Sequence, residues 1–537
     1  MTRDAMTAPP RQQLHQTYAA AVPELSVPWQ ADPPARPELA WLNEELAREL
    51  GYEPQWLRSP AGLALLTGQL DATGVPLAPG AEAPADDEAF TTAQVYAGHQ
   101  FGTPNPQLGD GRAVLLGDLI DTCGARRDLH LKGSGPTPVA RAGDGKAPLG
   151  PMLREAVVGE SLHALGIPTT RALAVVATGE QIPPRQGVTP EPGAILVRVA
   201  ASHLRVGTVE YAAWHLAEPV RTAVIDHAID RHHPAAREAE NPYLDLLRRV
   251  SEAQAELVAQ WMLLGFVHGV MNTDNMALSG EGIDYGPCAF LDVHRAAAVF
   301  SSIDRGGRYA YGNQPGIALW NLSRFAETLL PLIDPDDPDA SVEAATATLE
   351  GYEGHYLDAW ARGLAAKLGI PVDPAAPPGE RAASHIEPRS SPVAPAASSG
   401  DPDHLAAIRA LGEELLELLE SQAIDHTGFF RALTEGAATS LFTDPSPFRA
   451  WHQRLLDLRG SGPAADSAVA AMAGANPLYI PRNVHLDAAL RSAHLGDLEP
   501  VHRLLEAVAR PFERRPGLAD LEGPGDGGED FLTFCGT

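Results

Sequence analysis

Two short polar motifs constrain the fold of this chain more than any other feature. His268-Gly-Val-Met-Asn-Thr-Asp-Asn275 is followed, nine positions after its Asn, by Asp284-Tyr-Gly286. The His and Asn stand seven apart, as in the HRDxxxxN loop of protein kinases, where an Asp-aromatic-Gly motif also follows. In that arrangement the Asn and the second Asp hold magnesium against nucleotide phosphates. The spacing therefore predicts a magnesium–nucleotide site between a strand-rich and a helical part.

The loop departs from the kinase pattern at the position of the catalytic base. Val270 stands where a kinase has its Asp, and Asp274 lies directly before Asn275. The metal ligands are thus kept while the candidate base is moved. This combination predicts that the chain binds nucleotide and magnesium but transfers a different group.

Lys132 is the candidate phosphate-binding cation. Only three of the 40 basic residues are Lys, and this one follows alternating apolar residues in Asp128-Leu-His-Leu-Lys-Gly133, a strand pattern. A compact ammonium suits a phosphate. The alternative is a Lys at a strand end that reaches solvent.

Glu155 is the candidate partner of Lys132. It lies in residues 151–166, which begin with Pro and end with Gly as helices do. A carboxylate there can hold the Lys toward phosphates. Glu160 is the rival for that role, and a solvated Glu stabilised by the helix dipole is the other alternative.

Two Gly-Asp-Gly units bracket the strand that carries the Lys. Gln107-Leu-Gly-Asp-Gly-Arg112 precedes it and Arg141-Ala-Gly-Asp-Gly-Lys146 follows it. Glycines permit tight turns and close approach of the backbone to phosphate. Neither unit has the spacing of a P-loop.

Several longer motifs, taken together, resemble the selenoprotein O (SelO/YdiU) family over most of residues 35–365. The motifs are Tyr96-Ala-Gly-His-Gln-Phe-Gly102, Gln107–Arg112, Met271–Asn275, Ile283–Pro287 and Phe300–Pro315. The resemblance implies an α+β, protein-kinase-like (pseudokinase) bilobal fold with a strand-rich N-lobe, a helical C-lobe and extra C-terminal helices. It implies transfer of AMP from ATP, bound in a flipped orientation, to Ser, Thr or Tyr hydroxyls of proteins. Mg²⁺ is the implied cofactor, with Mn²⁺ as the alternative.

The resemblance also implies a role for individual residues. Asp274 corresponds to the proton acceptor, with Lys132 and Glu155 as further catalytic residues, and Asn275 and Asp284 correspond to the metal ligands. The residues that correspond to the ATP site are Gly109, Gly111, Arg112, Lys132, Asp144, Gly145, Arg198, Arg205 and Asp284.

Charge and composition restrict the classes of partner. The net charge of −29 opposes binding to nucleic acid or to an anionic membrane, so nucleotide binding is expected in a local basic pocket. The sequence has no apolar run long enough to span a membrane and no signal-peptide core at its start. These features favour a cytoplasmic protein.

The expected organisation follows changes in composition along the chain. A helix is expected around 37–51, and helical sequence at 253–266 leads into the loop. The predicted regions are an N-terminal arm with a helical extension (1–91), an N-lobe (92–214), a C-lobe (215–370), a Pro/Ala/Ser-rich linker (371–403), a C-terminal helical region (404–520) and a flexible tail (521–537).

The tail carries Cys535, one of three cysteines. The family places a Cys or selenocysteine near the C-terminus, which implies a redox partner: another protein or glutathione, or, less favoured, Cys288. An inert terminal Cys is the alternative. For the whole chain, two functions compete with AMP transfer: an ATP-dependent phosphotransferase, and an inactive nucleotide-binding scaffold.

Overall fold

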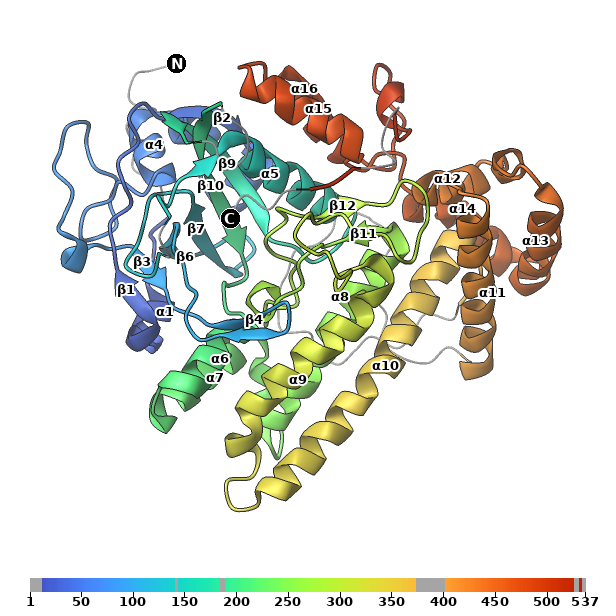
Figure 1. The fold of residues 1–537 in the computed structure, drawn as a ribbon, viewed down its shortest axis with the longest axis horizontal. Coiled ribbons are helices and arrows are strands. Elements are labelled where there is room, and N and C mark those ends of the chain that lie inside the picture. Colours follow the sequence, from blue (N-terminus) through green and yellow to red (C-terminus); the bar gives the residue numbers. More distant parts are fainter. Residues whose placement is uncertain (1–11, 141–142, 184–188, 373–400, 526–530, 534–537) are drawn as a thin grey trace.

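An antiparallel sheet forms the first part of the protein and helices form the rest (Figure 1). The computed structural model describes residues 12–140, 143–183, 189–372, 401–525 and 531–533. Within these ranges the main sheet has the order β1-β3-β6-β7-β10-β9-β2, and β8 also pairs with β10. These strands are β1 (Ser26–Pro28), β2 (Glu38–Leu42), β3 (Thr92–Gln94), β6 (Ala113–Ile120), β7 (Arg126–Lys132), β8 (Ala147–Pro148), β9 (Arg171–Ile182) and β10 (Glu191–Ala200). Two two-stranded sheets are formed by β4 (Gly98–Gln100) with β5 (Thr103–Asn105), and by β11 (Phe266–Val267) with β12 (Ala289–Phe290).

The central strands are apolar on both faces because both faces of the sheet are covered. Successive side chains of a strand point to opposite faces. In β10, Leu196 enters the larger hydrophobic core, whereas Ile195 and Val197 enter a second, smaller core. The smaller core includes residues of α2 (Glu44–Glu49), α3 (Pro54–Leu57) and α4 (Pro60–Leu66), and α5 (Leu149–Ala164) packs on β9 and β10 at the larger core.

The helices after the sheet continue the larger core. α8 is bounded by recognisable caps: the Asn241 side chain accepts a hydrogen bond from the Leu244 amide, and Gly265 ends the helix in a left-handed conformation. The C-terminal helices α15 and α16 return to pack on α5 (Figure 1). The longer helices here are α6 (Val206–His215), α7 (Glu218–His232), α8 (Pro242–Leu264), α9 (Gln314–Ile333), α10 (Pro338–Leu368), α11 (Pro402–Ser421), α12 (His426–Thr434), α13 (Pro445–Arg459), α14 (Pro463–Ala475), α15 (Asn483–His494) and α16 (Glu499–Val508).

The helices and strands agree with the sequence predictions, with one correction. The mixed α and β composition, the strand at Lys132 and the helices at 151–166 and 253–266 are confirmed. The helix expected over 37–51 is wrong in its first half, where Glu38–Leu42 pairs with β9 as an edge strand and only Glu44–Glu49 is helical. Alternation of exposed and buried residues along this segment suits an edge strand.

Two further predictions fall largely beyond the described residues. Most of the predicted linker, 373–400, and Cys535 lie outside them. In the described part of the tail, Thr533 pairs with Ser301 in a parallel bridge, and its hydroxyl donates to the Pro287 carbonyl at 2.7 Å. Among the described helices, none is long and apolar enough to cross a membrane.

Candidate active site

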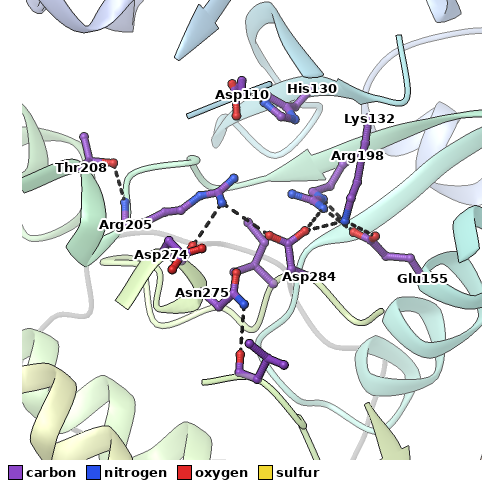
Figure 2. Close-up of polar contacts among 12 residues, drawn as sticks. Asp110, His130, Lys132, Glu155, Arg198, Arg205, Thr208, Asp274, Asn275 and Asp284 are labelled. Atoms are coloured by element: carbon purple, nitrogen blue, oxygen red, sulfur yellow. Dashed lines mark hydrogen bonds and ion pairs between the residues drawn. The ribbon is translucent and has the colours of Figure 1, made fainter. Parts of the chain in front are cut away.

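Three cationic side chains converge on the Asp284 carboxylate (Figure 2). Lys132 ends β7 and Arg198 lies on the adjacent β10, while Arg205 is the N-cap residue of α6. Asp284 Oδ1 lies 2.6 Å from Lys132 Nζ and 2.5 Å from Arg198 Nη2, and its Oδ2 lies 3.4 Å from Arg205 Nη1. Two central strands of the sheet and the start of α6 thus place their positive charges around one carboxylate.

Glu155 completes this cluster from α5. Its Oε2 lies 2.7 Å from Lys132 Nζ, which confirms the predicted ion pair, and its Oε1 accepts from Arg198. The rival Glu160 instead pairs with Arg171 and accepts from the Asn43 amide. Glu160 therefore ties α5 to β9 and takes no part in the cluster.

Both clustered carboxylates stay charged, although Glu155 is buried and Asp284 is half-buried. Burial alone raises the pKa of Glu155, but Arg198 and Lys132 outweigh it and hold this pKa below its ordinary value. Burial likewise opposes ionisation of Asp284, yet Arg198, Lys132 and Arg205 hold its pKa well below the usual range. These ion pairs hold the three cationic side chains together at one place.

Asp284 has a backbone conformation that non-glycine residues rarely adopt. Its φ is +65°, in the left-handed region. Such a conformation is found disproportionately at functional sites, where the surrounding structure holds it. Here it turns the carboxylate toward the cations, and His268 helps to hold the segment, since its buried Nε2 lies 2.8 Å from the Ile283 carbonyl oxygen.

Asp274 lies beside the cationic cluster on a 3₁₀ turn, η5 (Thr273–Asn275) (Figure 2). Arg205 Nη1 donates to its carbonyl oxygen at 3.1 Å, and Gln100 Nε2 lies 3.4 Å from its Oδ2. Its Oδ1 is buried and has no partner in the described part of the protein. Burial raises the pKa of the carboxyl to about 6, a value suited to proton exchange near neutral pH.

The loops that carry the two Gly-Asp-Gly units lie close together beyond the ends of β6 and β7. Gly109 has φ +115°, and a Cβ added at Gly111 would lie 2.9 Å from the Ala140 Cα, so the second unit's loop closes over the first. Gly145 has φ +66°, and its carbonyl accepts a hydrogen bond from the Gly135 amide at 3.1 Å. The positive φ of Gly109 and Gly145 and the close contact at Gly111 favour glycine at these three positions.

The remaining predicted nucleotide residues lie in the same loops. Arg112 is half-buried, and its carbonyl accepts from the Gly133 amide at 2.7 Å, directly after Lys132. Asp144 accepts a hydrogen bond from the Lys146 amide at 3.0 Å. The structure thus places these loop residues along the strand ends that adjoin the cluster. The residues that it brings into direct contact are Lys132, Glu155, Arg198, Arg205, Asp274 and Asp284.

One pair at the site was missed in the sequence. Asp110, between the two glycines, lies 2.8 Å through Oδ2 from His130 Nε2, and the same oxygen accepts from the Gln94 amide. Its carbonyl accepts from Thr137, so it fixes both loops. The sequence did contain an indication of this pair. His130 and Lys132 are two positions apart in a strand, so their side chains lie on the same face of β7.

A second missed group supports the loop of Asp274. The Thr273 hydroxyl donates to Glu210 at 2.5 Å, and Glu210 lies 2.5 Å from His99 Nδ1. The His99 amide in turn donates to the Thr273 hydroxyl. Glu210 is on α6 and His99 on β4, so no local spacing in the sequence relates them.

The side chains at the site suit Mg²⁺ that is bound together with a nucleotide. They do not suit a metal ion whose ligands all come from the protein. No group of three or more His, Cys, Asp or Glu side chains in the described ranges could hold a metal ion. Mg²⁺ commonly binds one or two carboxylates together with substrate phosphates and water. Asp284 provides a carboxylate, and Asn275 donates from Nδ2 to the Val270 carbonyl at 3.0 Å, leaving its amide oxygen on the side of Asp284 (Figure 2).

Cys288 is close in sequence to the site but chemically inert in this structure. It is fully buried, its thiol donates to the Tyr285 carbonyl, and burial raises its pKa to about 12. A thiol of this kind is a poor nucleophile at neutral pH. The burial of Cys288 agrees with its low preference as a redox partner of Cys535.

Comparison with known proteins identifies the family of this chain. The profile of the family described as protein adenylyltransferase SelO matches residues 12–509. A protein nucleotidyltransferase YdiU of Pseudarthrobacter chlorophenolicus is 49% identical over 527 residues, covering 97% of both chains. The YdiU protein of Mycolicibacterium smegmatis is 49% identical over 535 residues, covering 98% of each, and that of Cereibacter sphaeroides is 46% identical over 529 residues, covering 97% of this chain and 98% of its own. This chain therefore belongs to the SelO/YdiU family of nucleotidyltransferases.

Proposed function

We propose that this protein transfers AMP from ATP to Ser, Thr or Tyr hydroxyls of proteins and releases diphosphate. The observation that carries the proposal is the convergence of Lys132, Arg198 and Arg205 on Asp284, with Asp274 beside them. Three clustered cations in a chain of net charge −29 suit a triphosphate. We further propose that the sheet and the helices correspond to the two lobes of a kinase-like fold.

Each side chain has a distinct task in this proposal. Lys132, Arg198 and Arg205 bind the phosphates and neutralise the charge that develops on the leaving diphosphate. Glu155 keeps Lys132 and Arg198 extended toward the site. The loops at 109–112 and 144–145 provide backbone that can approach the nucleotide closely.

Asp274 is proposed to accept the proton of the acceptor hydroxyl. The hydroxyl oxygen forms a bond to the α-phosphorus, the bond from that phosphorus to the bridging oxygen breaks, and diphosphate leaves with its electron pair. The proton passes to the Asp274 carboxylate, whose unpartnered Oδ1 is available to receive it. Asp284 and Asn275 would hold Mg²⁺, which when bound neutralises phosphate charge.

Labelling with two forms of ATP tests this function. ATP labelled at the α-phosphate and ATP labelled at the γ-phosphate are each incubated with the protein, Mg²⁺ and an acceptor protein mixture. Retention of the α-label alone on protein is the expected result. Retention of the γ-label would identify a phosphotransferase, and retention of neither, with Mn²⁺ also tested, would identify a nucleotide-binding scaffold.

A further inference from the structure

A small hairpin, β4 with β5, lies directly on the turn that carries Asp274. The His99 amide donates to the Thr273 hydroxyl at 2.7 Å, and Gln100 reaches Asp274 Oδ2. Gly98 is required here, because a Cβ would lie 2.9 Å from Asp274 Oδ1. In Figure 1 the hairpin lies beside α6, which also packs on α9, and β4 contacts the turn η5 that carries Asp274.

Phe101, at the tip of this hairpin, is both exposed and strained. Its φ is +52°, and 36% of its surface is exposed to solvent. A bulky residue in the left-handed region is unusual and strained. Its amide is held by Asn272 Oδ1 at 3.0 Å and by the Tyr309 hydroxyl at 3.2 Å. The Phe101 ring packs on Tyr309, with ring centroids 5.0 Å apart, and its remaining surface faces solvent.

Arg308 lies next to this aromatic tip and has no carboxylate partner among the described residues. Its guanidinium carbon is 4.7 Å from the Trp320 ring centroid, and a Cβ at Gly102 would lie 3.4 Å from it. Within the described ranges no Asp or Glu lies at ion-pair distance from Arg308, and its Nε is buried without a hydrogen-bond partner. A half-buried cation of this kind is suited to binding an anionic group.

The aromatic surface continues beyond Arg308. His99 contacts both Trp214 and Trp320, each with a ring-centroid distance of 5.4 Å, and Trp214 is 40% exposed. Phe101, Trp214, Arg308 and Trp320 thus surround the outer side of the hairpin; we call these four residues the hairpin surface. Aromatic and Arg side chains are the types enriched at the centres of protein interfaces.

The segment that carries Arg308 has a net charge opposite to that of the whole protein. Residues 295–308 include three Arg and one Asp, although the chain has 69 acidic and 40 basic residues. That one carboxylate, Asp304, is buried and accepts from the amides of Arg308 and Tyr309, so it is used within the segment. The local positive charge favours an acidic partner.

We propose that the hairpin surface binds the acceptor protein, as an extended segment with an apolar side chain and a carboxylate close to the modified hydroxyl. The apolar side chain packs on Phe101 and Trp214, and the carboxylate pairs with Arg308. This inference rests on the proposed function, because it places an acceptor beside Asp274. It adds which side chains of the acceptor segment are recognised, a point that the proposed function does not specify.

Peptide binding tests the proposal without requiring turnover. Two fluorescein-labelled peptides share a central Tyr followed by Leu, and differ in whether two Glu or two Lys flank them. Fluorescence anisotropy with the full-length protein and Mg²⁺-ATP should give about five- to tenfold tighter binding of the acidic peptide. Arg308→Gln should remove most of this preference, and Phe101→Gly should weaken both peptides by about tenfold.

Phe101→Gly removes the aromatic ring without adding backbone strain. Gly tolerates the left-handed conformation of this position, so a loss of peptide affinity reports the ring and not a distorted hairpin. Arg491→Gln, on the exposed surface of α15, is the matched control for Arg308→Gln and should bind as wild type. The rise in Tm on adding Mg²⁺-ATP is recorded for every variant and reports the nucleotide site separately.

The failure of this inference and the failure of the proposed function are distinguishable. Equal affinity for the two peptides, no measurable binding, or wild-type affinity in Arg308→Gln would overturn the hairpin surface as an acidic-acceptor site. Failure of α-label transfer with an intact charge preference would instead contradict AMP transfer and leave the binding surface standing.

Discussion

Lys132 Nζ lies 2.6 Å from Asp284 Oδ1, although 152 residues separate them in sequence. The same ammonium lies 2.7 Å from Glu155, so it bridges two carboxylates. Together with Arg198 and Arg205, the cluster has three positive and two negative groups. The excess positive charge favours phosphate, and in the proposed function Asp284 would exchange cationic side chains for the metal when a metal–nucleotide binds. Ligand binding is therefore expected to rearrange these ion pairs.

Asp284→Asn tests the role of that carboxylate. Asn tolerates the left-handed backbone, so the variant removes charge with little added strain. We expect AMP transfer to fall by at least about 10²-fold, as on removing preorganised charge stabilisation, and the Mg²⁺ concentration for half-maximal rate to rise. The measurement is initial rate against Mg²⁺, alongside Tm. Wild-type turnover at wild-type Mg²⁺ would show that Asp284 does not hold the metal.

The proton-acceptor role of Asp274 predicts a specific pH dependence. Its pKa is raised to about 6, so the carboxylate that can accept a proton predominates above pH 6 and is lost below it. The single-turnover rate should therefore be nearly constant above about pH 7 and fall about tenfold per pH unit well below 6. Asp274→Asn should be slow and lack this acidic limb. A wild-type rate that is flat from pH 5 to 8 would contradict the assignment.

The sequence was most informative where chemistry depends on local spacing. The His268-to-Asn275 loop, the strand of Lys132 and the helix of Glu155 all follow from short-range patterns, and their ion pair was predicted correctly. The choice between Glu155 and Glu160 depended on which face of α5 meets the cations. That face is set by packing, which no periodicity in the helix determines.

The residues that hold the Asp274 loop in place could not be predicted, because they are far from it in sequence. Glu210 and His99 are 111 residues apart yet hold the Asp274 loop through Thr273. The left-handed backbone conformation of Asp284 could not be predicted either, because in a sequence this conformation is indicated mainly by glycine. The edge strand β2 was predicted as helix because its apolar residues suit either structure until β9 is present to pair with it.

The missed Asp110–His130 pair gives a prediction about nucleotide affinity. Asp110 fixes the Gly109–Gly111 backbone, and the hydrogen bond from His130 holds Asp110 in place. His130→Phe should therefore weaken ATP binding about three- to tenfold, the cost of one lost hydrogen bond, with a smaller change in the single-turnover rate at saturating ATP. Isothermal titration with Mg²⁺-ATP measures the affinity. A large loss of rate with unchanged affinity would instead place His130 in the chemical step.

Lys367 gives a prediction about stability that is independent of the active site. It is buried on α10, with Nζ 4.3 Å from the Phe430 ring centroid and 3.5 Å from the Ala475 carbonyl oxygen. Among the described residues no carboxylate lies at ion-pair distance from it. Burial accordingly lowers its pKa from 10.5 to about 7. The folded protein thus prefers this lysine uncharged.

The buried Lys367 should make the stability of the protein depend on pH. Between about pH 7 and 10.5 the unfolded chain holds a proton that the folded protein has released, so the free energy of unfolding rises with pH in this window. Below pH 7 both states are protonated, and the full penalty of burying the charge remains. Lys367→Met replaces the ammonium with an apolar group of similar length. It should raise Tm most at pH 6 to 7, by about 1 °C for each kcal/mol of penalty removed in a chain of this length, and progressively less toward pH 10. Thermal unfolding of wild type and variant across this range provides the measurement, with Lys146→Met, which loses an ion pair to Asp32, as the control expected to lower Tm. A Lys367→Met variant less stable than wild type at pH 6 would show that the contact with Phe430 outweighs the cost of burying the charge.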